Sequence, residues 1–351
     1  MENRSEGVQA GGLLPAALRN RPRRWLVTGA AGFIGSHLVE HLLAADQQVT
    51  GLDNFSTGRR ENLVAVRQAV TAGQGERLSF VEGDIRDPAV CLAACAGADV
   101  VLHQAALGSV PRSIEAPLAT HEVNVTGFVN LLEAARCSGI RRVVYASSSS
   151  VYGDHPALPK TEAHVGRPLS PYAASKACDE AYAAGFASCY GLELVGLRYF
   201  NVFGPRQDPA GAYAAVMPRW FAALLLEGRE IVINGDGETS RDFCYVENVV
   251  QANLLAATTE RAGALGQVYN VAFGARTTLN ELFRRIRDEA ARYRPAVASA
   301  QPVHGPFRDG DVRHSLADVS KAVELLGYRP THSVEQGLRL AAAWYATAAG
   351  G

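Results

Sequence analysis

A glycine-rich turn between an apolar run and a helix restricts the possible folds of this chain more than any other feature. Residues 28–35 (TGAAGFIG) follow the apolar run 25–27 and begin a pattern of apolar residues at helical spacing. Gly29 would allow a tight turn, Gly32 would let the backbone approach a pyrophosphate, and Gly35 would let the helix pack on the strand. Free N–H groups at the start of the helix would face the phosphate charge. The turn therefore predicts a dinucleotide-binding fold, with Phe33 and Ile34 beside the ligand.

Apolar runs of strand length alternate with helical patterns through the first two-thirds of the chain. Such alternation predicts an α/β fold with a Rossmann-type, doubly wound parallel sheet that is covered on both faces. The runs are 25–27, 48–52, 78–81, 100–102, 143–145, 194–197 and 268–271.

Proline, glycine and loop signals become more frequent after Asn201, which predicts a smaller α/β lobe interleaved with the sheet domain. The expected division is a flexible extension at 1–22, a sheet domain at 23–200 to which 249–275 return, and a lobe made of 201–248 and 276–351.

Composition narrows the class of protein. The 351 residues are 48% hydrophobic and 20% charged, with a formal net charge of −1, which is typical of a soluble globular protein and argues against a nucleic-acid partner. Six cysteines without a Cys-x-x-Cys pair favour reduced thiols in the cytoplasm, and we expect no metal site around Cys91 and Cys95. No apolar run approaches the ~20 residues that span a bilayer, so no membrane association is expected.

Acidic and polar residues follow the predicted strands at the places where a dinucleotide would lie. Asp53 comes eighteen residues after Gly35, where a carboxylate accepts hydrogen bonds from the adenosine ribose and repels a 2′-phosphate. This favours NAD over NADP, although Arg59 and Arg60 come soon after. The other residues that we expect at the cofactor are Asn54, Thr57, Gly58, Asp84, Ile85, Gln104, Ala105 and Ala106.

Tyr172 and Lys176 form the candidate reacting pair. Four residues apart on a helix, they share one face, where an ammonium can favour the ionised form of a phenol. The pattern alone is weak, and a solvated helix face is its plain alternative. Here it lies downstream of the glycine turn and just after the serine run 147–150, which favours redox chemistry on an alcohol.

In this order, the motifs resemble the extended short-chain dehydrogenase/reductase family from Trp25 onward. Within that family the chain is similar to UDP-hexose 4-epimerases. Segments 201–205 (NVFGP) and 235–243 (GDGETSRDF) look like nucleotide-sugar-binding segments. Three others resemble the branch that acts on UDP-N-acetylglucosamine and UDP-N-acetylgalactosamine: 103–113 (HQAALGSVPRS), 211–216 (GAYAAV) and 310–318 (GDVRHSLAD).

The resemblance implies a mechanism. Tyr172, as phenolate, would take the proton of the sugar C4 hydroxyl while hydride passes from C4 to NAD⁺. Lys176 would hold the nicotinamide ribose, and Ser148, with Ser149 as its neighbour, would bond the reacting oxygen. The 4-keto sugar would then turn and take the hydride back on its other face.

Two positions after Ser148 separate this chain from other branches of the family. The 4,6-dehydratases carry an Asp-Glu pair there as acid and base, and uronate decarboxylases carry a glutamate at the second position. This chain has Ser149 and Ser150, neither of which can ionise in that role. Epimerisation needs only the tyrosine and the hydride transfer, so it remains the reaction that the resemblance implies.

The resemblance also implies a wide sugar pocket. Ser315 stands where epimerases restricted to non-acetylated sugars carry a tyrosine, Gly108 replaces a lysine of some relatives, and Ala215 is small. Ser109, Ser148, Ser149 and Asn201 would line the same pocket, with Val216 and Asn234 close by. Arg241, Arg308 and Asp311 match positions that hold the UDP diphosphate and the uridine ribose, for which a guanidinium offers paired donors.

The resulting hypothesis is an NAD-dependent epimerase that interconverts UDP-GlcNAc and UDP-GalNAc, with the unacetylated UDP-sugars as further candidates. One alternative is a UDP-uronic acid substrate, for which Arg112 would be the cationic partner. An alternative of another class is a redox sensor that binds NAD without chemistry. Members of the family often dimerise through two helices per subunit, so we expect a homodimer through 123–137 and 172–190.

Overall fold

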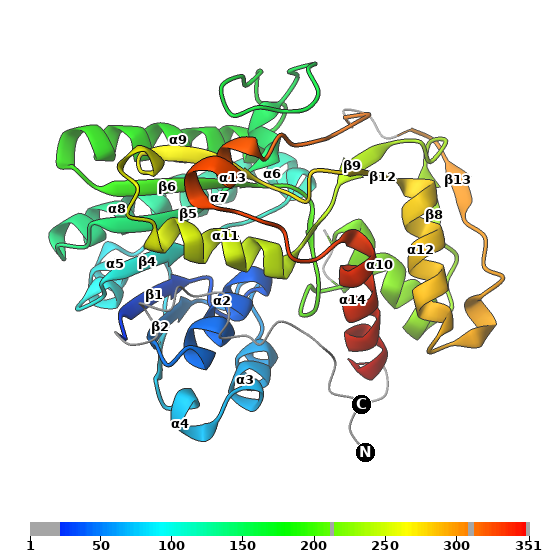
Figure 1. Cartoon of the computed structure of the whole chain (residues 1–351), viewed down its shortest axis with the longest axis horizontal. Helices are drawn as coiled ribbons and strands as arrows, with labels where there is room; N and C mark the ends of the chain where they lie inside the picture. The colour runs from blue at the N-terminus through cyan, green and yellow to red at the C-terminus, as the bar shows by residue number, and fades with distance from the viewer. Residues whose placement is uncertain (1–21, 211–213, 308–311, 349–351) are drawn as a thin grey trace.

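The computed structural model describes residues 22–210, 214–307 and 312–348. Within these residues, seven parallel strands form one sheet in the spatial order β11-β6-β5-β4-β1-β2-β3 (Figure 1). The strands coincide with the seven apolar runs, so the predicted Rossmann-type fold is confirmed. They are β1 (Arg24–Thr28), β2 (Gln48–Asp53), β3 (Leu78–Glu82), β4 (Val100–His103), β5 (Arg142–Ser148), β6 (Glu193–Tyr199) and β11 (Gln267–Val271).

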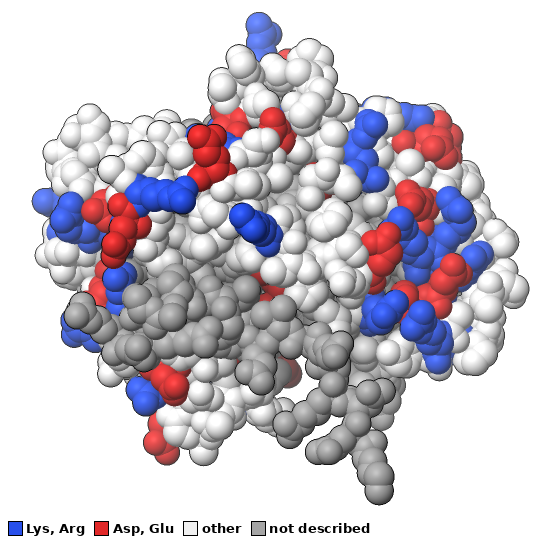
Figure 2. All heavy atoms as spheres, viewed as in Figure 1, with Lys and Arg blue, Asp and Glu red and all other residues white. Residues whose placement is uncertain are grey.

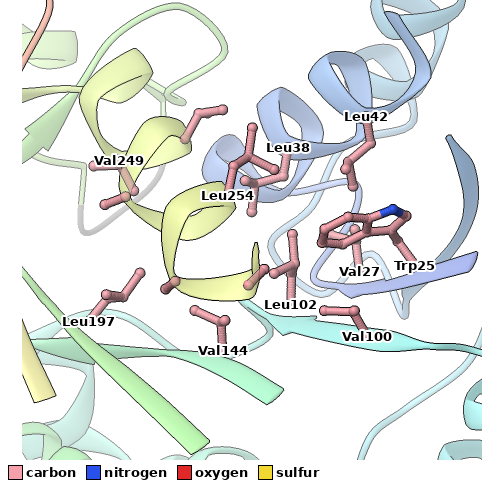
Figure 3. Close-up of a cluster of buried hydrophobic side chains, with 14 of the residues drawn as sticks. Trp25, Val27, Leu38, Leu42, Val100, Leu102, Val144, Leu197, Val249 and Leu254 are labelled. Carbon is pink, nitrogen blue, oxygen red and sulfur yellow. The ribbon is translucent and has the colours of Figure 1, made fainter. Parts of the chain in front are cut away.

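Helices cover both faces of the sheet because successive side chains of each strand point to opposite sides. Trp25 and Val27 of β1 belong to a cluster on one side of the sheet, which also contains side chains of α2 (Phe33–Ala44), α11 (Val246–Thr258) and α13 (Ser320–Leu326). Figure 3 shows this cluster, in which side chains of β1, β4, β5 and β6 meet those of α2 and α11. The alternate residue Leu26 points to the other side, toward α5 (Pro88–Cys95), α8 (Gly127–Cys137) and α9 (Pro171–Tyr190).

Shorter elements connect these layers. They are α3 (Arg60–Ala69), α4 (Ala72–Gly75), α6 (Val110–Glu115), α7 (Pro117–His121), the π-helix η2 (Glu122–Thr126), and the 3₁₀ turns η3 (Ser149–Tyr152) and η5 (Ala262–Ala264). The order of strands changes direction between β1 and β4, with β2 and β3 on one side and β4, β5 and β6 on the other. In open α/β sheets, ligands bind at such a point, outside the carboxyl ends of the strands.

A second hydrophobic cluster lies beside the sheet, around Trp220, Phe221, Phe283, Leu338 and Tyr345. Its strands form two-stranded sheets: β7 (Val202–Phe203) with β10 (Cys244–Tyr245), β8 (Val232–Asn234) with β13 (Val303–Gly305), and β9 (Ser240–Asp242) with β12 (Arg276–Thr278). Its helices are α10 (Val216–Ala222), η4 (Ala223–Glu227), α12 (Leu279–Ala291), η6 (Pro295–Val297) and α14 (Val334–Ala348). We refer to this part as the second lobe; the predicted domain bounds stay a prediction.

The surface carries charges of both signs. On the face in Figure 2, basic and acidic side chains are interspersed, notably over the region of α12, where Arg285 pairs with Glu281. Among the described residues, no helix has the length and apolar character needed to cross a membrane.

Candidate active site

A cavity of about 580 Å³ lies along the carboxyl ends of β1, β2, β4 and β5, at the point where the strand order changes direction. It brings together most of the residues that the sequence predicts for the site. Those lining it are Gly29, Gly32, Phe33, Ile34, Gly35, Asp53, Asn54, Thr57, Asp84, Ile85, Gln104, Ala105, Ala106, Gly108, Ser109, Ser148, Ser149, Tyr172, Lys176 and Asn201. The cavity therefore connects the predicted cofactor residues to the predicted reacting residues.

The glycine turn is packed so closely that side chains are excluded from it. Gly29 has a φ of +66°, and a Cβ there would lie 2.8 Å from the backbone nitrogen of Ala105. A Cβ on Gly35 would lie 2.0 Å from the carbonyl oxygen of Gly29. The helix α2 can thus begin directly against the turn, with its N-terminus at the cavity. A pyrophosphate fits such a backbone cradle.

Asp53 is fixed by backbone donors at the end of β2. Its carboxylate accepts hydrogen bonds from the N–H groups of Ala31 (2.9 Å) and Phe55 (2.8 Å). Burial raises the pKa of this carboxyl, although the backbone hydrogen bonds oppose the shift. Gly58 does not line the cavity, but a Cβ there would lie 2.8 Å from Asp53 Oδ1, so it makes room for the carboxylate.

Salt bridges engage the basic residues near Asp53. Arg60 pairs with Glu82 at 2.8 Å, and Arg59 pairs with Asp208 at 3.2 Å. Both guanidinium groups are paired with carboxylates, and Asp53 lies at the end of β2, where we expect the adenosine ribose. This geometry suits the plain adenosine ribose of NAD rather than a 2′-phosphate.

A small polar network holds the loop after β3 at one end of the cavity, where we expect the adenine of the cofactor. Asn54 Nδ2 donates to Asp84 Oδ2 at 2.8 Å, and Arg86 pairs with the same carboxylate at 2.7 Å. The Arg86 hydrogen bond lowers the pKa of Asp84 to about 2. The carboxylate is therefore ionised at neutral pH.

The long helix α9 carries the reacting pair, and its ends explain why it forms there. Ser170 caps the N-terminus by accepting from the N–H of Ala173 at 3.1 Å, with Pro171 at the first helical position. Gly191 ends the helix in the left-handed conformation. Tyr172 and Lys176 lie in the first two turns of this helix, and both line the cavity.

Lys176 is almost fully buried, with 2% of its surface exposed. Its Nζ donates to the carbonyl oxygen of Ala146 and to Asp179 Oδ2, both at 3.0 Å. Burial lowers the pKa of Lys176, but Asp179, together with Tyr172 and Glu180, raises it, and the net pKa lies above the usual value. Sequence reasoning missed Asp179, although an acid three residues after a lysine on a helix is a recognisable pair.

The serine run continues from β5 into η3 and reaches the cavity beside Tyr172. Ser148 Oγ accepts hydrogen bonds from the N–H of Ser150 at 3.1 Å and from its hydroxyl at 2.9 Å. With these donors in place, the hydroxyl hydrogen of Ser148 is available to a ligand. Ser150 also lines the cavity, and sequence reasoning considered it only as the residue that replaces a catalytic acid.

Asn201 lies at the junction between the sheet and the second lobe. Its φ of +32° is unusual for a residue other than glycine, and its side chain donates to the carbonyl oxygen of Asp242 at 2.9 Å. Strained backbone of this kind is common at binding sites. Next to it, Tyr199 donates to Gln104 Oε1 at 3.0 Å and holds that cavity residue in place.

Of the predicted residues of the second lobe that the structure describes, only Asn201 lines this cavity. The backbone N–H of Ser315 donates to the carbonyl oxygen of Ser240 at 3.0 Å, and Arg241 donates to the same oxygen at 3.0 Å. The remaining predicted residues of the lobe lie elsewhere: Ala215 is at the start of α10, Val216 is within α10, and Asn234 is in β8. Arg308 and Asp311 lie outside the described residues. The roles of all these residues in sugar binding stay predictions.

The fold and the cavity together define a dinucleotide-binding protein with a tyrosine, a lysine and a serine at one end of the ligand site. Residues 25–272 match the NAD dependent epimerase/dehydratase family. The chain belongs to this family and is NAD-dependent. The backbone cradle at Gly29 and Gly35 and the carboxylate of Asp53 fit that cofactor.

Relatives in the family act on several UDP-sugars. A UDP-glucose 4-epimerase of Mycolicibacterium smegmatis is 41% identical over 317 residues, which are 90% of this chain and 96% of the relative. The UDP-glucuronate 4-epimerase 3 of Arabidopsis thaliana is 35% identical over 350 residues, covering 94% of this chain and 79% of the relative. A solved UDP-N-acetylglucosamine 4-epimerase from Methanobrevibacter ruminantium, in complex with UDP-N-acetylmuramic acid, superposes with a TM-score of 0.84 at 39% identity. That match covers 93% of this chain and 99% of the other.

Proposed function

We propose that this protein is a UDP-sugar 4-epimerase that interconverts UDP-GlcNAc and UDP-GalNAc. The observation that carries the proposal is the arrangement of Tyr172, Lys176 and Ser148 around one end of a cavity that continues to the glycine turn and Asp53. The proposed reaction needs such an arrangement, because the sugar C4 must lie beside both a base and the nicotinamide.

Three side chains would transfer the proton and orient the sugar and the cofactor. Tyr172 would take the proton from the C4 hydroxyl and return it after the sugar has turned. Ser148 would donate to the same oxygen, since Ser150 already supplies hydrogen bonds to Ser148 Oγ. Lys176 would hold the nicotinamide ribose and stabilise the phenolate by its charge. Bound NAD⁺ supplies the acceptor, and then the donor, of the hydride.

The serine run supports epimerisation over elimination of water. A dehydratase needs an acid and a base next to the serine, and Ser149 and Ser150 offer only hydroxyl groups there. The hydroxyl of Ser150 is also committed to Ser148, at 2.9 Å. The 4-keto sugar would therefore persist until it has turned and recovered its hydride.

Small residues support an acetylated sugar as the substrate. Gly108 lines the cavity, and a Cβ placed on it would meet no atom of the described residues within 4 Å. Ser109 lies next to it at the start of α6. Together with Ala215 and Ser315, these residues would leave room for an N-acetyl group. The similarity to a UDP-N-acetylglucosamine 4-epimerase supports the same choice.

A UDP-uronic acid is the second candidate substrate. Arg112 lies in α6, three residues after the cavity residue Ser109, whose hydroxyl accepts from the Arg112 N–H at 3.2 Å. Arg112 itself is not among the residues that line the cavity, and its guanidinium would bind a sugar carboxylate only if it turned toward Ser109. The similarity to a UDP-glucuronate 4-epimerase supports keeping this alternative.

A substrate panel tests the proposal. The NAD-loaded protein is incubated separately with UDP-GlcNAc, UDP-glucose and UDP-glucuronic acid, and the products are resolved by chromatography. We expect UDP-GalNAc to form with the highest kcat/KM of the three reactions. Faster turnover of UDP-glucuronic acid would favour the second candidate, and no turnover of any of the three by folded, NAD-loaded protein would exclude the proposed activity.

We also propose a homodimer through the ranges 123–137 and 172–190, which fall mainly in α8 and α9. The exposed side chains of Tyr182 and Tyr190 support this interface, with 46% and 54% of their surfaces exposed. Light scattering should give twice the mass of one chain; the mass of a single chain would exclude the dimer.

A further inference from the structure

Asp179 is a buried carboxylate that the proposed reaction does not use. It lies in α9 with 1% of its surface exposed, and its Oδ2 accepts from Lys176 Nζ at 3.0 Å. Its other oxygen, Oδ1, is buried and has no hydrogen-bond partner among the described residues. An ionised group so fully removed from water is costly unless its charge has a function or a partner.

The contacts of Lys176 indicate what Asp179 provides. A lysine ammonium has three N–H donors, and two of them are used by Ala146 O and Asp179 Oδ2. The third is then left for the cavity, which Lys176 lines together with Tyr172. Asp179 therefore fixes the direction of the ammonium as well as balancing its charge.

Burial alone would lower the pKa of Lys176. Desolvation is the largest influence on its pKa and lowers it, and the charge and hydrogen bond of Asp179 are what raise it above the usual value. Burial also raises the pKa of Asp179, to about 6, so the carboxylate is mainly ionised at neutral pH. The 3.0 Å contact between Lys176 Nζ and Asp179 Oδ2 has the geometry of a buried ammonium–carboxylate pair.

Other charged or titratable groups near Lys176 and Asp179 raise the pKa of Lys176 less than Asp179 does, or are neutral. Tyr172 and Glu180, both on α9, favour the ammonium more weakly than Asp179 does. Arg198 of β6 takes up the charge of Glu180 in a salt bridge of 2.7 Å. From β4, the buried His103 has a pKa lowered to about 3 by burial and by Lys176, so it is neutral.

Two further elements meet this part of α9 with neutral groups. Tyr145 of β5 is buried, and burial raises its pKa well above the usual value, so the phenol stays protonated. Asn124 of η2 donates to Ser175 Oγ at 3.0 Å. Asp179 is therefore the main source of negative charge for Lys176 within the described residues.

We propose that Asp179 is a positioning residue for Lys176, whose carboxylate keeps the buried lysine charged and directs its third N–H into the cavity. The role in catalysis rests on the proposed function, since it acts through the residues assigned to the nicotinamide ribose and the C4 oxygen. The expected effect on NAD retention requires only the cofactor, so it does not depend on which sugar is the substrate.

NAD retention tests the proposal without any sugar. The Asp179→Asn variant keeps a hydrogen-bond acceptor of the same shape but removes the charge. Holoenzyme is equilibrated at pH values from neutral to alkaline, and the NAD that remains after gel filtration is measured. We expect the loss of NAD to begin at a pH lower by about one unit or more than in the unchanged protein. An unchanged onset in a folded Asp179→Asn variant would overturn the proposal.

Two companion variants separate charge from structure. Asp179→Glu keeps the charge and should restore most of the alkaline range. Lys176→Arg places a group that does not lose its proton, so its NAD retention should show no alkaline onset. If Asp179→Asn fails to fold, the arginine variant still tests the proposal. NAD loss that begins at the same alkaline pH in Lys176→Arg would show that Lys176 is not the titrating group. Asp288→Asn, on the surface of α12, is the matched control and should behave like the unchanged protein.

Turnover gives a second readout once a substrate is known. The alkaline limb of the kcat profile should move to lower pH in Asp179→Asn, by the same amount as NAD retention. Failure of the substrate panel would leave the NAD experiment intact, so the two proposals fail separately. A loss of kcat that is equal at all pH values, with normal NAD retention, would contradict the charge-setting role.

Discussion

The cofactor end of the cavity and the second lobe differ in how far their residues could be placed from sequence. At the cofactor end, the predicted residues follow consecutive strands of one sheet, and all of them except Gly58 line one cavity. In the second lobe, the other predicted residues that the structure describes are spread over α10, β8, β9 and the segment around Ser315. Only Asn201, at the junction with the sheet, lines that cavity.

The difference has a physical cause. The carboxyl ends of parallel strands meet at one edge of a sheet, so residues just after each strand are brought together by backbone geometry. The second lobe is built from two-stranded sheets around a separate hydrophobic cluster. The position of a side chain there depends on tertiary packing, which local sequence patterns do not encode. Five variants test these regions and their surroundings, beginning with the largest expected effect.

Tyr172→Phe removes the proposed base and leaves the ring in place. We expect kcat to fall by about 10²- to 10⁴-fold, the usual contribution of a general base, with NAD retention and thermal unfolding nearly unchanged. Steady-state kinetics on the best substrate of the panel measures this. Turnover within a few-fold of the unchanged protein would remove Tyr172 from the reaction.

Gly35→Ala tests the backbone cradle at the cofactor end. The new Cβ would lie 2.0 Å from the carbonyl oxygen of Gly29, so the turn must shift. We expect a loss of roughly 1 to 3 kcal/mol in the free energy of unfolding and little NAD after purification. Gly263→Ala is the control, because a Cβ there would meet no atom of the described residues within 4 Å. Normal NAD content in Gly35→Ala would contradict the cradle.

Asp53→Asn tests the proposed ribose partner. An amide would place a donor against one of the backbone N–H groups of Ala31 and Phe55 that now hold the carboxylate. We expect NAD affinity to fall by about 10- to 100-fold, as for loss of a hydrogen bond to a charged group. Asp236→Asn in the second lobe should leave NAD affinity as it is. An equal fall in NAD affinity in Asp53→Asn and Asp236→Asn would contradict the assignment of the cofactor to the Asp53 end of the cavity.

Ser315→Tyr tests the second lobe itself. If Ser315 leaves room for an N-acetyl group, the larger ring should lower kcat/KM for UDP-GlcNAc by roughly 10-fold or more relative to UDP-glucose. Ser299→Tyr, at an exposed position of the same lobe, controls for bulk alone. Equal losses on both substrates would argue against the role of Ser315 in the pocket.

His41→Gln tests the buried pair that links α2, the helix that begins at the glycine turn, to α11. His41 of α2 bonds Glu247 of α11 at 2.7 Å, and the neighbouring His37 bonds the carbonyl oxygen of Pro205 in the segment leading to the second lobe. Burial lowers the pKa of His41, but the carboxylate of Glu247 raises it, and the net pKa lies above the usual value. Burial raises the pKa of Glu247, but the charge of His41 lowers it, and the net pKa lies below the usual value.

The pH window follows from these directions. A raised histidine pKa gives stability that is complete below its ordinary value of 6.5 and is lost as the pH rises. A lowered glutamate pKa gives stability that is present above 4.5 and is lost as the pH falls. His41→Gln should therefore cost the most, roughly 1.5 to 3 kcal/mol, between these values in denaturant unfolding. The exposed His121→Gln should cost little. A cost that grows at alkaline pH would contradict the ion pair.

The fold and the reacting pair could be predicted because they depend on periodicity and short spacing. The strands β1 to β6 and β11 were readable as apolar runs, and Tyr172 and Lys176 lie within two turns of one helix. Asp179 and Ser150 were not assigned, since their roles come from hydrogen bonds to Lys176 and Ser148 that only the folded chain makes. Gly58 is a similar case: it supports Asp53 and does not face the ligand site.

The central claim is that a hydride leaves C4 of the sugar and returns to the same carbon. NAD-loaded protein incubated in ordinary water with UDP-GlcNAc carrying deuterium at C4 tests it most directly, with UDP-GalNAc examined by mass spectrometry. We predict that UDP-GalNAc forms and keeps the deuterium, because the hydride does not exchange with water. UDP-GalNAc that has lost its label, or no UDP-GalNAc at all, would contradict the account.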